Sequence, residues 1–301
     1  MTFLNKIAGS RHVWSILGAT LTLMGAAWLS AVQSGSDQSN CLEFKFRPIA
    51  STIHATTERR PSEKSRHPLD EAFEFVQPSI QALQKVNDYS AVFTKTELVH
   101  GRLLTQKMDM KFREKPFSVY FHGHSKRKAG REVIFVAGRN DGRLIVHEVG
   151  LKSIVGTMNL TPDDPKVMDT NRHPITDVGM ANIINSALDI WKNEKRTLDP
   201  ANTEVRIVQS VQAGGKECEA VEIVHHHPQP GLDYQVGRVY VDKETRFPVQ
   251  AELYGWPEAP GDEPPLLEQY IYTNVKTNIG LVDADFDPQN REYRFAVSLR
   301  D

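Results

Sequence analysis

Two consecutive stretches of alternating residues constrain the fold of this 301-residue chain more than any other feature. Within residues 107–113, the apolar Met108, Met110 and Phe112 stand between charged residues, and residues 117–122 repeat the alternation with aromatic and aliphatic side chains. A repeat of two is typical of a β-strand with one buried and one solvated face. The pattern therefore predicts a long antiparallel sheet, whose bulky apolar face must be covered by a helix, a second sheet or a ligand.

The N-terminal region predicts export. Lys6 and Arg11 precede an uncharged, mostly apolar run at residues 13–32. About 20 such residues can span a bilayer, whereas a signal-peptide core usually has ~7–15. Basic residues ahead of the run are expected to stay on the cytoplasmic side. Residues 1–36 are therefore interpreted either as an uncleaved signal anchor, which would hold the protein to the inner membrane, or as a signal peptide cut near Ser34.

The remaining chain divides into a linker and a folded region. Residues 37–68 are rich in Ser, Thr, Arg and Lys and have little apolar periodicity, which is typical of a flexible tether. Residues 69–301 are expected to form a single β-rich domain. Helices are expected at residues 69–86 and 177–195, where apolar residues recur at spacings of three and four. Pro78 should kink or interrupt the first helix, and Thr176 or Asp177 should cap the second.

Strands are expected on both sides of the second helix. The alternation and the turn residues place them at approximately residues 90–99, 103–114, 117–122, 131–137, 143–149, 204–211, 217–225, 234–241, 249–254 and 268–276. A further turn is expected near residues 150–160. Neither half has enough elements to cover its own apolar face, so the break at Arg196 is interpreted as a crossover within one sheet. The predicted fold is α+β: one large curved antiparallel sheet with helices covering its concave face.

The sequence carries no recognisable catalytic motif. A glycine-flanked serine, a zinc-helix histidine pair, a phosphate loop and a Cys-Xaa-Xaa-Cys pair are all missing from the 301 residues. We therefore predict no catalytic residue and no cofactor, and we expect a protein that is not an enzyme. The net charge of −2, without a basic stripe, argues against nucleic acid as a partner.

No metal site is expected either. Three adjacent histidines at residues 225–227 point to alternating sides of an extended chain, so they are interpreted as a solvated strand end. His122 and His124 could share a face, but the basic residues 126–128 follow them. Residues 283–287 begin like a calcium loop and lack its glycine and closing glutamate, so they are interpreted as a polar segment around a buried Phe286.

Two further features have alternative interpretations. Arg172 and His173 precede the second helix and could bind an anion at its free N–H groups; alternatively, Pro174 and a salt bridge of Arg172 hold this loop in place. The two cysteines, Cys41 and Cys218, could form a disulfide in an exported protein. In the other interpretation, Cys218 is a small buried apolar residue.

Several short motifs occur together in the sequence: Asp88-Tyr89, the segment Lys115 to Tyr120, Gly130 to Val133, Gly138 to Gly142 and Asn171 to Ile175. In combination they resemble domain-of-unknown-function family 1571, a family of exported bacterial proteins. The resemblance spans Leu69 to Phe295 and implies no activity.

A second resemblance concerns shape. Residues 239–248 and 270–286 resemble the closing strands of outer-membrane lipoprotein carriers, which implies a half-open barrel with helices on its concave side. The leading hypothesis is an envelope or periplasmic protein, reaching the membrane through its N-terminal segment, that binds a lipid, an acyl chain or another apolar ligand in the concave face. An envelope protein-interaction or sensor module and a hydrolase are the alternatives. The expected ligand-binding residues are Phe93, Met108, Met110, Phe112 and Phe121, which are bulky, apolar and on one predicted face.

Overall fold

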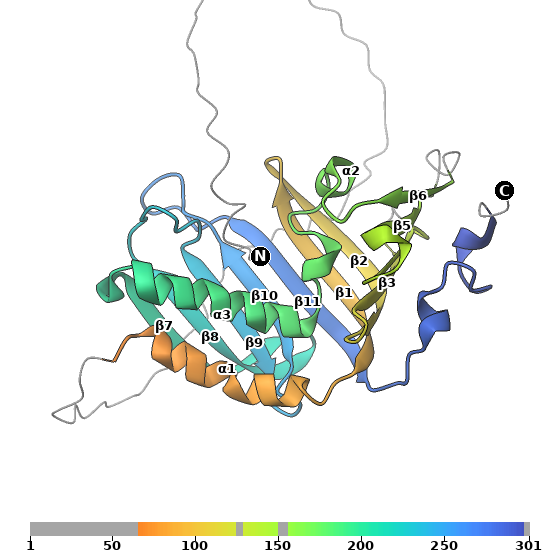
Figure 1. Ribbon diagram of the computed structural model, residues 1–301. Coiled ribbons are helices and arrows are strands. Elements are labelled where there is room, and N and C mark those ends of the chain that lie inside the picture. Colours follow the sequence, from red (N-terminus) through yellow and green to blue (C-terminus); the bar gives the residue numbers. More distant parts are fainter. Residues whose placement is uncertain (1–65, 125–128, 150–155, 298–301) are drawn as a thin grey trace, which may run out of the picture. The chain divides into compact units, whose positions relative to one another are not determined.

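The computed structural model describes residues 66–124, 129–149 and 156–297. This part of the chain forms one antiparallel sheet of eleven strands in the order β6-β5-β4-β3-β2-β1-β11-β10-β9-β8-β7 (Figure 1). The edges β6 and β7 do not pair, so the sheet formed by the described residues is open. The expected α+β fold with a large antiparallel sheet is confirmed, with eleven strands rather than about ten. The expected signal segment, most of the tether and Cys41 lie outside the described residues.

The strands agree with the sequence expectation to within about two residues at most ends, because the alternating pattern and the turn residues are local signals. Gly138, Asn140, Asp141 and Gly142 have positive φ angles in the expected turn. The strands are β1 (Asp88–Val99), β2 (Arg102–Arg113), β3 (Ser118–Gly123), β4 (Glu132–Val136), β5 (Leu144–His147), β6 (Thr157–Leu160), β7 (Thr203–Ala213), β8 (Lys216–His225), β9 (Val236–Asp242), β10 (Pro248–Tyr254) and β11 (Leu266–Thr277).

Two long helices lie on one side of the sheet, which we call the inner face (Figure 1). Helix α1 (Leu69–Leu83) packs against β7 and β8, and α3 (Met180–Thr197) packs against α1 and β10. Their apolar stripes meet Val221, Ile223 and Val239 of the sheet in a buried cluster. The helices therefore cover the β7–β10 half of this face. The expectation of helices on the concave face is confirmed, and they cover about one half of it.

The connection from β6 to β7 crosses the entire sheet, because these strands form its two edges. Residues 161–179, which we call the strap, form the first part of this connection and contain only one helical turn, α2 (Pro165–Met168), and one short 3₁₀ turn (Ile175–Asp177). Helix α3 forms most of the rest. The expectation of a crossover within one sheet is confirmed.

Two local expectations need correction. Helix α1 runs through Pro78 without interruption, so the interruption, one of the two effects expected of Pro78, is wrong. Pro78 and Glu74, whose carbonyl lacks the hydrogen bond that Pro78 cannot donate, are both exposed to water. Helix α3 is not capped by Thr176 or Asp177, because its N-cap residue is Gly179, with no side-chain cap of its own. The hydroxyls of two core tyrosines replace the cap: Tyr272 accepts from the N–H of Gly179 (3.2 Å), and Tyr89 accepts from that of Met180 (3.1 Å).

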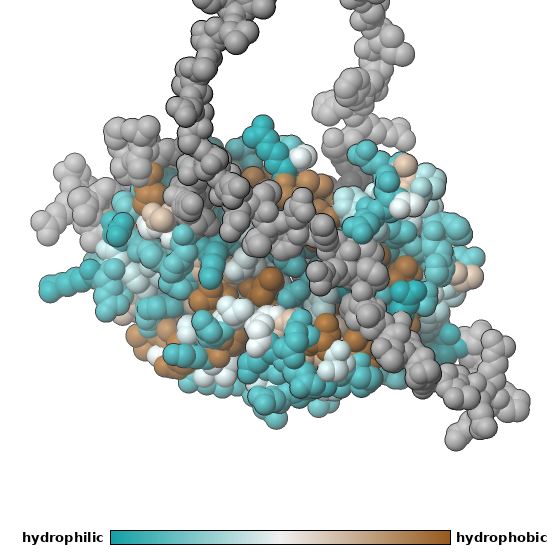
Figure 2. All heavy atoms as spheres, turned by 180° about the vertical axis from the view of Figure 1, so that it is seen from behind, coloured by the Kyte–Doolittle hydropathy of each residue, from teal (hydrophilic) through white to brown (hydrophobic). Residues whose placement is uncertain are grey.

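The chain after β11 packs on the opposite side of the sheet, the outer face. Two 3₁₀ turns, Asp283–Phe286 and Arg294–Val297, lie against β3, β4 and β5. Phe286, Tyr293 and Phe295 are buried there against Tyr120 and Ile134, as expected for Phe286. Seen from behind, the surface carries mostly hydrophilic residues, with hydrophobic ones between them (Figure 2).

Candidate functional site

The five expected ligand-binding residues come together on the inner face. Strand register places Phe93 opposite Met108, and Met110 opposite Phe121. Phe93, Met110 and Phe112 are 1–3% exposed and Met108 is 7% exposed, whereas Phe121 is half-buried at the edge of the cluster. The rings of Phe93 and Phe121 stack with centroids 5.9 Å apart. We call this group and its neighbours Tyr89, Tyr270 and Tyr272 the aromatic cluster.

The strap, not a long helix, covers much of this half of the inner face. Ile175 and Val178 of the strap and Met180 at the start of α3 pack on the aromatic cluster. Val167 of α2 packs on the adjoining cluster of β4–β6, which includes Phe135. Leu83 at the end of α1 and Ile183 in the first turn of α3 also pack on the aromatic cluster, so the helix ends share this cover with the strap.

A set of charged side chains, of which Glu268 and Glu97 are buried, holds the strap to the sheet. Arg172 and His173 both contact the carboxylate of Glu268 on β11: Nε of Arg172 lies 2.9 Å and Nε2 of His173 lies 2.7 Å from Oε2. The backbone N–H of Arg172 donates to Oε2 of Glu97 on β1 (3.2 Å). The interpretation that a salt bridge of Arg172 holds this loop in place is thus confirmed, and its partner is Glu268.

Further hydrogen bonds join Lys95, Glu97, Arg172, His173 and Glu268 into one group, which we call the ionic cluster. Lys95 Nζ donates to Glu97 Oε2 and to Asn171 Oδ1, both at 2.6 Å. The hydroxyl of Tyr270 donates to Glu97 Oε1 (2.8 Å). Lys95 and Glu97 follow Phe93 on the same face of β1, so the inner face changes from aromatic to ionic along one strand. Burying charges is costly unless they are paired and hydrogen-bonded, as they are here.

The pKa values in the cluster show which charges are favoured. Burial raises the pKa of Glu268, but His173 and Arg172 outweigh burial and hold it below its ordinary value of 4.5. Burial lowers the pKa of His173, yet the Glu268 carboxylate outweighs it and raises this pKa above 6.5. Burial lowers the pKa of Lys95 below 10.5, although Glu97 opposes the effect. The charged His173–Glu268 pair is therefore the favoured state of the folded protein near neutral pH.

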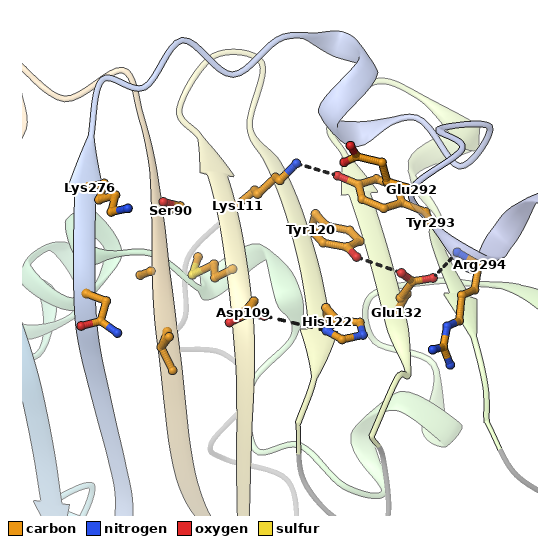
Figure 3. A pocket seen from close by; sticks show the side chains of 14 residues that line it. Ser90, Asp109, Lys111, Tyr120, His122, Glu132, Lys276, Glu292, Tyr293 and Arg294 are labelled. Atoms are coloured by element: carbon orange, nitrogen blue, oxygen red, sulfur yellow. Dashed lines mark hydrogen bonds and ion pairs between the residues drawn. The ribbon is translucent and has the colours of Figure 1, made fainter.

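A groove of about 550 Å³ lies on the outer face, behind the aromatic cluster (Figure 3). Strands β11, β1, β2 and β3 form its floor, and the chain around Tyr293 forms one wall. The side chains that give it a polar character are Ser90, Asp109, Lys111, Tyr120, His122, Glu132, Asn274, Lys276, Glu292 and Arg294.

Most polar groups of the wall are hydrogen-bonded. Glu132 accepts from the Tyr120 hydroxyl (2.9 Å) and from the backbone N–H of Arg294 (2.7 Å) (Figure 3). Lys111 donates to Tyr293 (3.0 Å) and to Asp285 (2.7 Å). Burial and the Glu132 carboxylate raise the pKa of Tyr120, which keeps its hydroxyl a donor. Such a wall is suited to polar recognition.

Sequence reasoning did not find the groove. Alternation placed Asp109 and Lys111 on the solvated side of one strand and Tyr120 and His122 on that of the next. Their meeting depends on the β2–β3 register, which sets Asp109 opposite His122, and on the fold-back of the chain around Tyr293.

The other candidate motifs occupy structural positions. His225 is fully buried between Thr203 and Glu194, so the expectation of a solvated strand end is wrong for this residue and correct for His226 and His227. Cys218 is free and fully buried. Among the described residues, no helix is long and apolar enough to cross a membrane.

Comparisons with known proteins identify a family but no activity. No curated protein matches the chain. Several solved structures are similar at low identity. A DUF1329 family protein from Desulfovibrio piger is 14% identical, with a TM-score of 0.36, over 74% of this chain and 98% of that one. The Mycobacterium tuberculosis lipoprotein LppX is 12% identical, with a TM-score of 0.40, over 72% and 99%.

A LolA superfamily protein from Nitrosomonas europaea is 10% identical, with a TM-score of 0.28, over 72% of this chain and 97% of its own. These similarities are too distant to assign a function. The family model for proteins of unknown function DUF1571 matches residues 86–295, so the match begins after α1 and not at Leu69. It covers more than half of the chain, and this protein therefore belongs to the DUF1571 family.

Proposed function

We propose that this protein is a non-enzymatic binding protein of the cell envelope that holds a lipid or acyl chain on the inner face, beneath the strap. One observation supports the proposal above others. The aromatic cluster, which includes all five expected ligand-binding residues, is covered by the irregular strap and by the ends of α1 and α3, whereas both helices lie along the other half of the same face. A cover of this kind can move without unfolding the sheet.

The apolar contacts of the strap are weaker than those that an acyl chain can make. Val167 is buried and Ile175 and Val178 are half-buried, so together they contribute less than the roughly 5–9 kcal/mol of three fully buried side chains. A sixteen-carbon acyl chain has about fourteen methylenes, which at about 0.8 kcal/mol each amount to roughly 11 kcal/mol. An acyl chain could therefore replace the strap on the aromatic cluster.

The ionic cluster suits a reversible cover. Buried ion pairs add little net stability, because the desolvation of the charges offsets their attraction. The contacts of Arg172 and His173 with Glu268 therefore specify where the strap sits and add little to its net stability. The methionines below it have flexible side chains, which adapt to irregular ligands.

The proposed location is outside the cytoplasm. Lys6 and Arg11 ahead of the apolar residues 13–32 support export. Alkaline phosphatase fused after Arg300 should be active, because that enzyme needs an oxidising compartment. A fusion that is made at normal level and is inactive would contradict export.

A photoreactive fatty acid tests the binding function in cells that produce the full chain. The parent should form a covalent adduct on peptides of β1–β3. Phe121→Glu places a charge at the half-buried edge of the cluster and should reduce the adduct about tenfold or more, since each 1.4 kcal/mol changes affinity tenfold. The matched control is Leu103→Glu, because Leu103 is 47% exposed on β2 and lies outside the cluster.

The outcomes separate the alternatives. Equal adducts in the parent and Phe121→Glu, or none in the folded parent, would remove the acyl-binding function. The groove on the outer face supports a second candidate, recognition of a segment of an envelope protein. A photoreactive residue at the exposed Lys276 would then capture a protein, while the fatty acid forms no adduct.

A further inference from the structure

Three side chains that commonly bind transition metals meet at one end of the groove. Asp109 on β2 lies directly opposite His122 on β3, and His124 follows two residues later, on the same side of the chain. The backbone N–H of His124 donates to the carbonyl of Lys107 (2.8 Å), so pairing with β2 continues past the end of β3. The position of His124 is therefore set by the backbone of β2.

We propose that Asp109, His122 and His124 form a binding site for a divalent transition metal, with Zn²⁺ the foremost candidate. Their ligand atoms all lie within 4.8 Å of one another. Oδ2 of Asp109 is 2.6 Å from Nε2 of His124 and 3.8 Å from Nδ1 of His122. Ligands at about 2.0–2.2 Å from a tetrahedral zinc stand roughly 3.3 Å apart, so small side-chain rotations would suffice.

The donor set selects the metal class. Two imidazoles and a carboxylate suit zinc, copper, nickel or iron, whereas calcium and magnesium prefer oxygen donors alone. The side chains of Asp109, His122 and His124 are 51%, 33% and 45% exposed, so an ion can enter from solvent. Three protein ligands leave at least one coordination position open, as in catalytic and exchangeable sites and unlike closed structural ones.

Nearby charges permit a cation at this place. Lys111 is two residues from Asp109 on the same face, but the Asp285 carboxylate lies 2.7 Å from its ammonium group. Glu132 lies opposite His122 and adds negative charge, while hydrogen bonds from Tyr120 and from Arg294 occupy its two oxygens. Glu132 is therefore a neighbouring charge and not a ligand.

This proposal revises the expectation that the two histidines hold no metal. That expectation gave weight to the basic residues 126–128, which lie outside the described residues, and took no account of Asp109. Asp109 precedes His122 by 13 positions, and only the strand register brings the two together.

Zinc titration of the full chain tests the site. The protein would be purified in mild detergent without a histidine tag, freed of metal with a chelator, and titrated with ZnCl₂ against a colorimetric zinc indicator. His122→Ala, His124→Ala and Asp109→Asn should each weaken zinc binding by about tenfold or more, since the loss of one ligand exceeds 1.4 kcal/mol. The matched control is the double variant His226→Ala/His227→Ala, which removes two exposed adjacent histidines elsewhere on the surface.

Two results would overturn the proposal. One is zinc affinity that is unchanged in His122→Ala and His124→Ala; the other is zinc affinity that is lost in the control variant instead. X-ray absorption of the zinc-loaded parent provides a readout that does not depend on any variant. It should show two imidazole ligands, and a spectrum with none or one would also exclude the site.

Discussion

Gly179 offers the sharpest test of how the strap joins the sheet. It precedes α3 with φ 127° and ψ 148°, a combination that is almost restricted to glycine. A Cβ at this position would lie 3.0 Å from two carbons of the Phe112 ring. That ring cannot easily move, because it stacks on Tyr89 at 4.8 Å and meets Phe117 edge-on at 5.3 Å. Gly179→Ala should therefore act through both the backbone and the core.

The two effects have separate magnitudes. The backbone conformation should cost about 1–3 kcal/mol, and overpacking against Phe112 about 1–3 kcal/mol more. For a folded region of this size, 1 kcal/mol corresponds to about 2–4 °C in Tm. Thermal unfolding of the full chain, followed by circular dichroism, should therefore show a Tm lower by roughly 5–20 °C.

A control glycine lacks the packing part. Gly215 also has a positive φ, +75°, but nothing lies within 4 Å of a Cβ built there. Gly215→Ala should lose only the backbone part. Adding Phe112→Leu to Gly179→Ala should recover part of the loss, with a coupling of about 1 kcal/mol. Equal losses in the two alanine variants, or strict additivity with Phe112→Leu, would refute the proposed contact.

Three further predictions follow from the same face of the sheet and from Cys218. Tyr89→Phe and Tyr272→Phe each remove a hydroxyl that accepts from the start of α3, so each should cost about 0.5–2 kcal/mol in urea denaturation; wild-type stability in both would contradict the tyrosine caps. The stability difference between the parent and His173→Gln should be larger at pH 5.5 than at pH 9. Because folding raises the pKa of His173, its charge stabilises the folded protein fully below pH 6.5, and this stabilisation is lost as the pH rises through the raised pKa. Because folding lowers the pKa of Glu268, its charge stabilises the folded protein above pH 4.5. A difference independent of pH would show that folding does not raise the pKa of His173. Burial raises the pKa of the Cys218 thiol to about 11, so iodoacetamide at pH 8 should leave this residue unmodified until the chain unfolds, as peptide mass spectrometry would show.

The parts of the fold that could be predicted are those encoded by neighbouring residues. Met108, Met110 and Phe112 share one face because successive side chains of a strand alternate. The turn at residues 138–142 could be predicted because glycine, asparagine and aspartate tolerate positive φ. The crossover could be predicted from a global argument, since neither half of the sheet can bury its own apolar face.

The parts that could not be predicted depend on contacts between distant residues. Helix α3 lacks a local cap because tyrosines on β1 and β11, about 90 residues away in opposite directions along the chain, supply the acceptors. The strap lacks a periodic pattern of apolar residues. It is held to β1 and β11 instead by contacts of Arg172 and His173 with charged side chains of these strands. Residue propensities alone therefore predict only an irregular loop there.

The register between β2 and β3 explains why neither the aromatic cluster nor the proposed metal site could be fully predicted from the sequence. A shift of one residue between β2 and β3 would turn His122 away from Asp109, and it would also separate Met110 from Phe121 on the other face. The aromatic cluster and the proposed metal site thus lie back to back on the same pair of strands and depend on one register. Burial of the aromatic cluster fixes that register, because any slip would expose Met110 and Phe112 to water. Packing on the inner face therefore positions the metal-binding side chains on the outer face. A substitution that disturbs the packing of Met110 should consequently weaken zinc binding, although Met110 contributes no ligand.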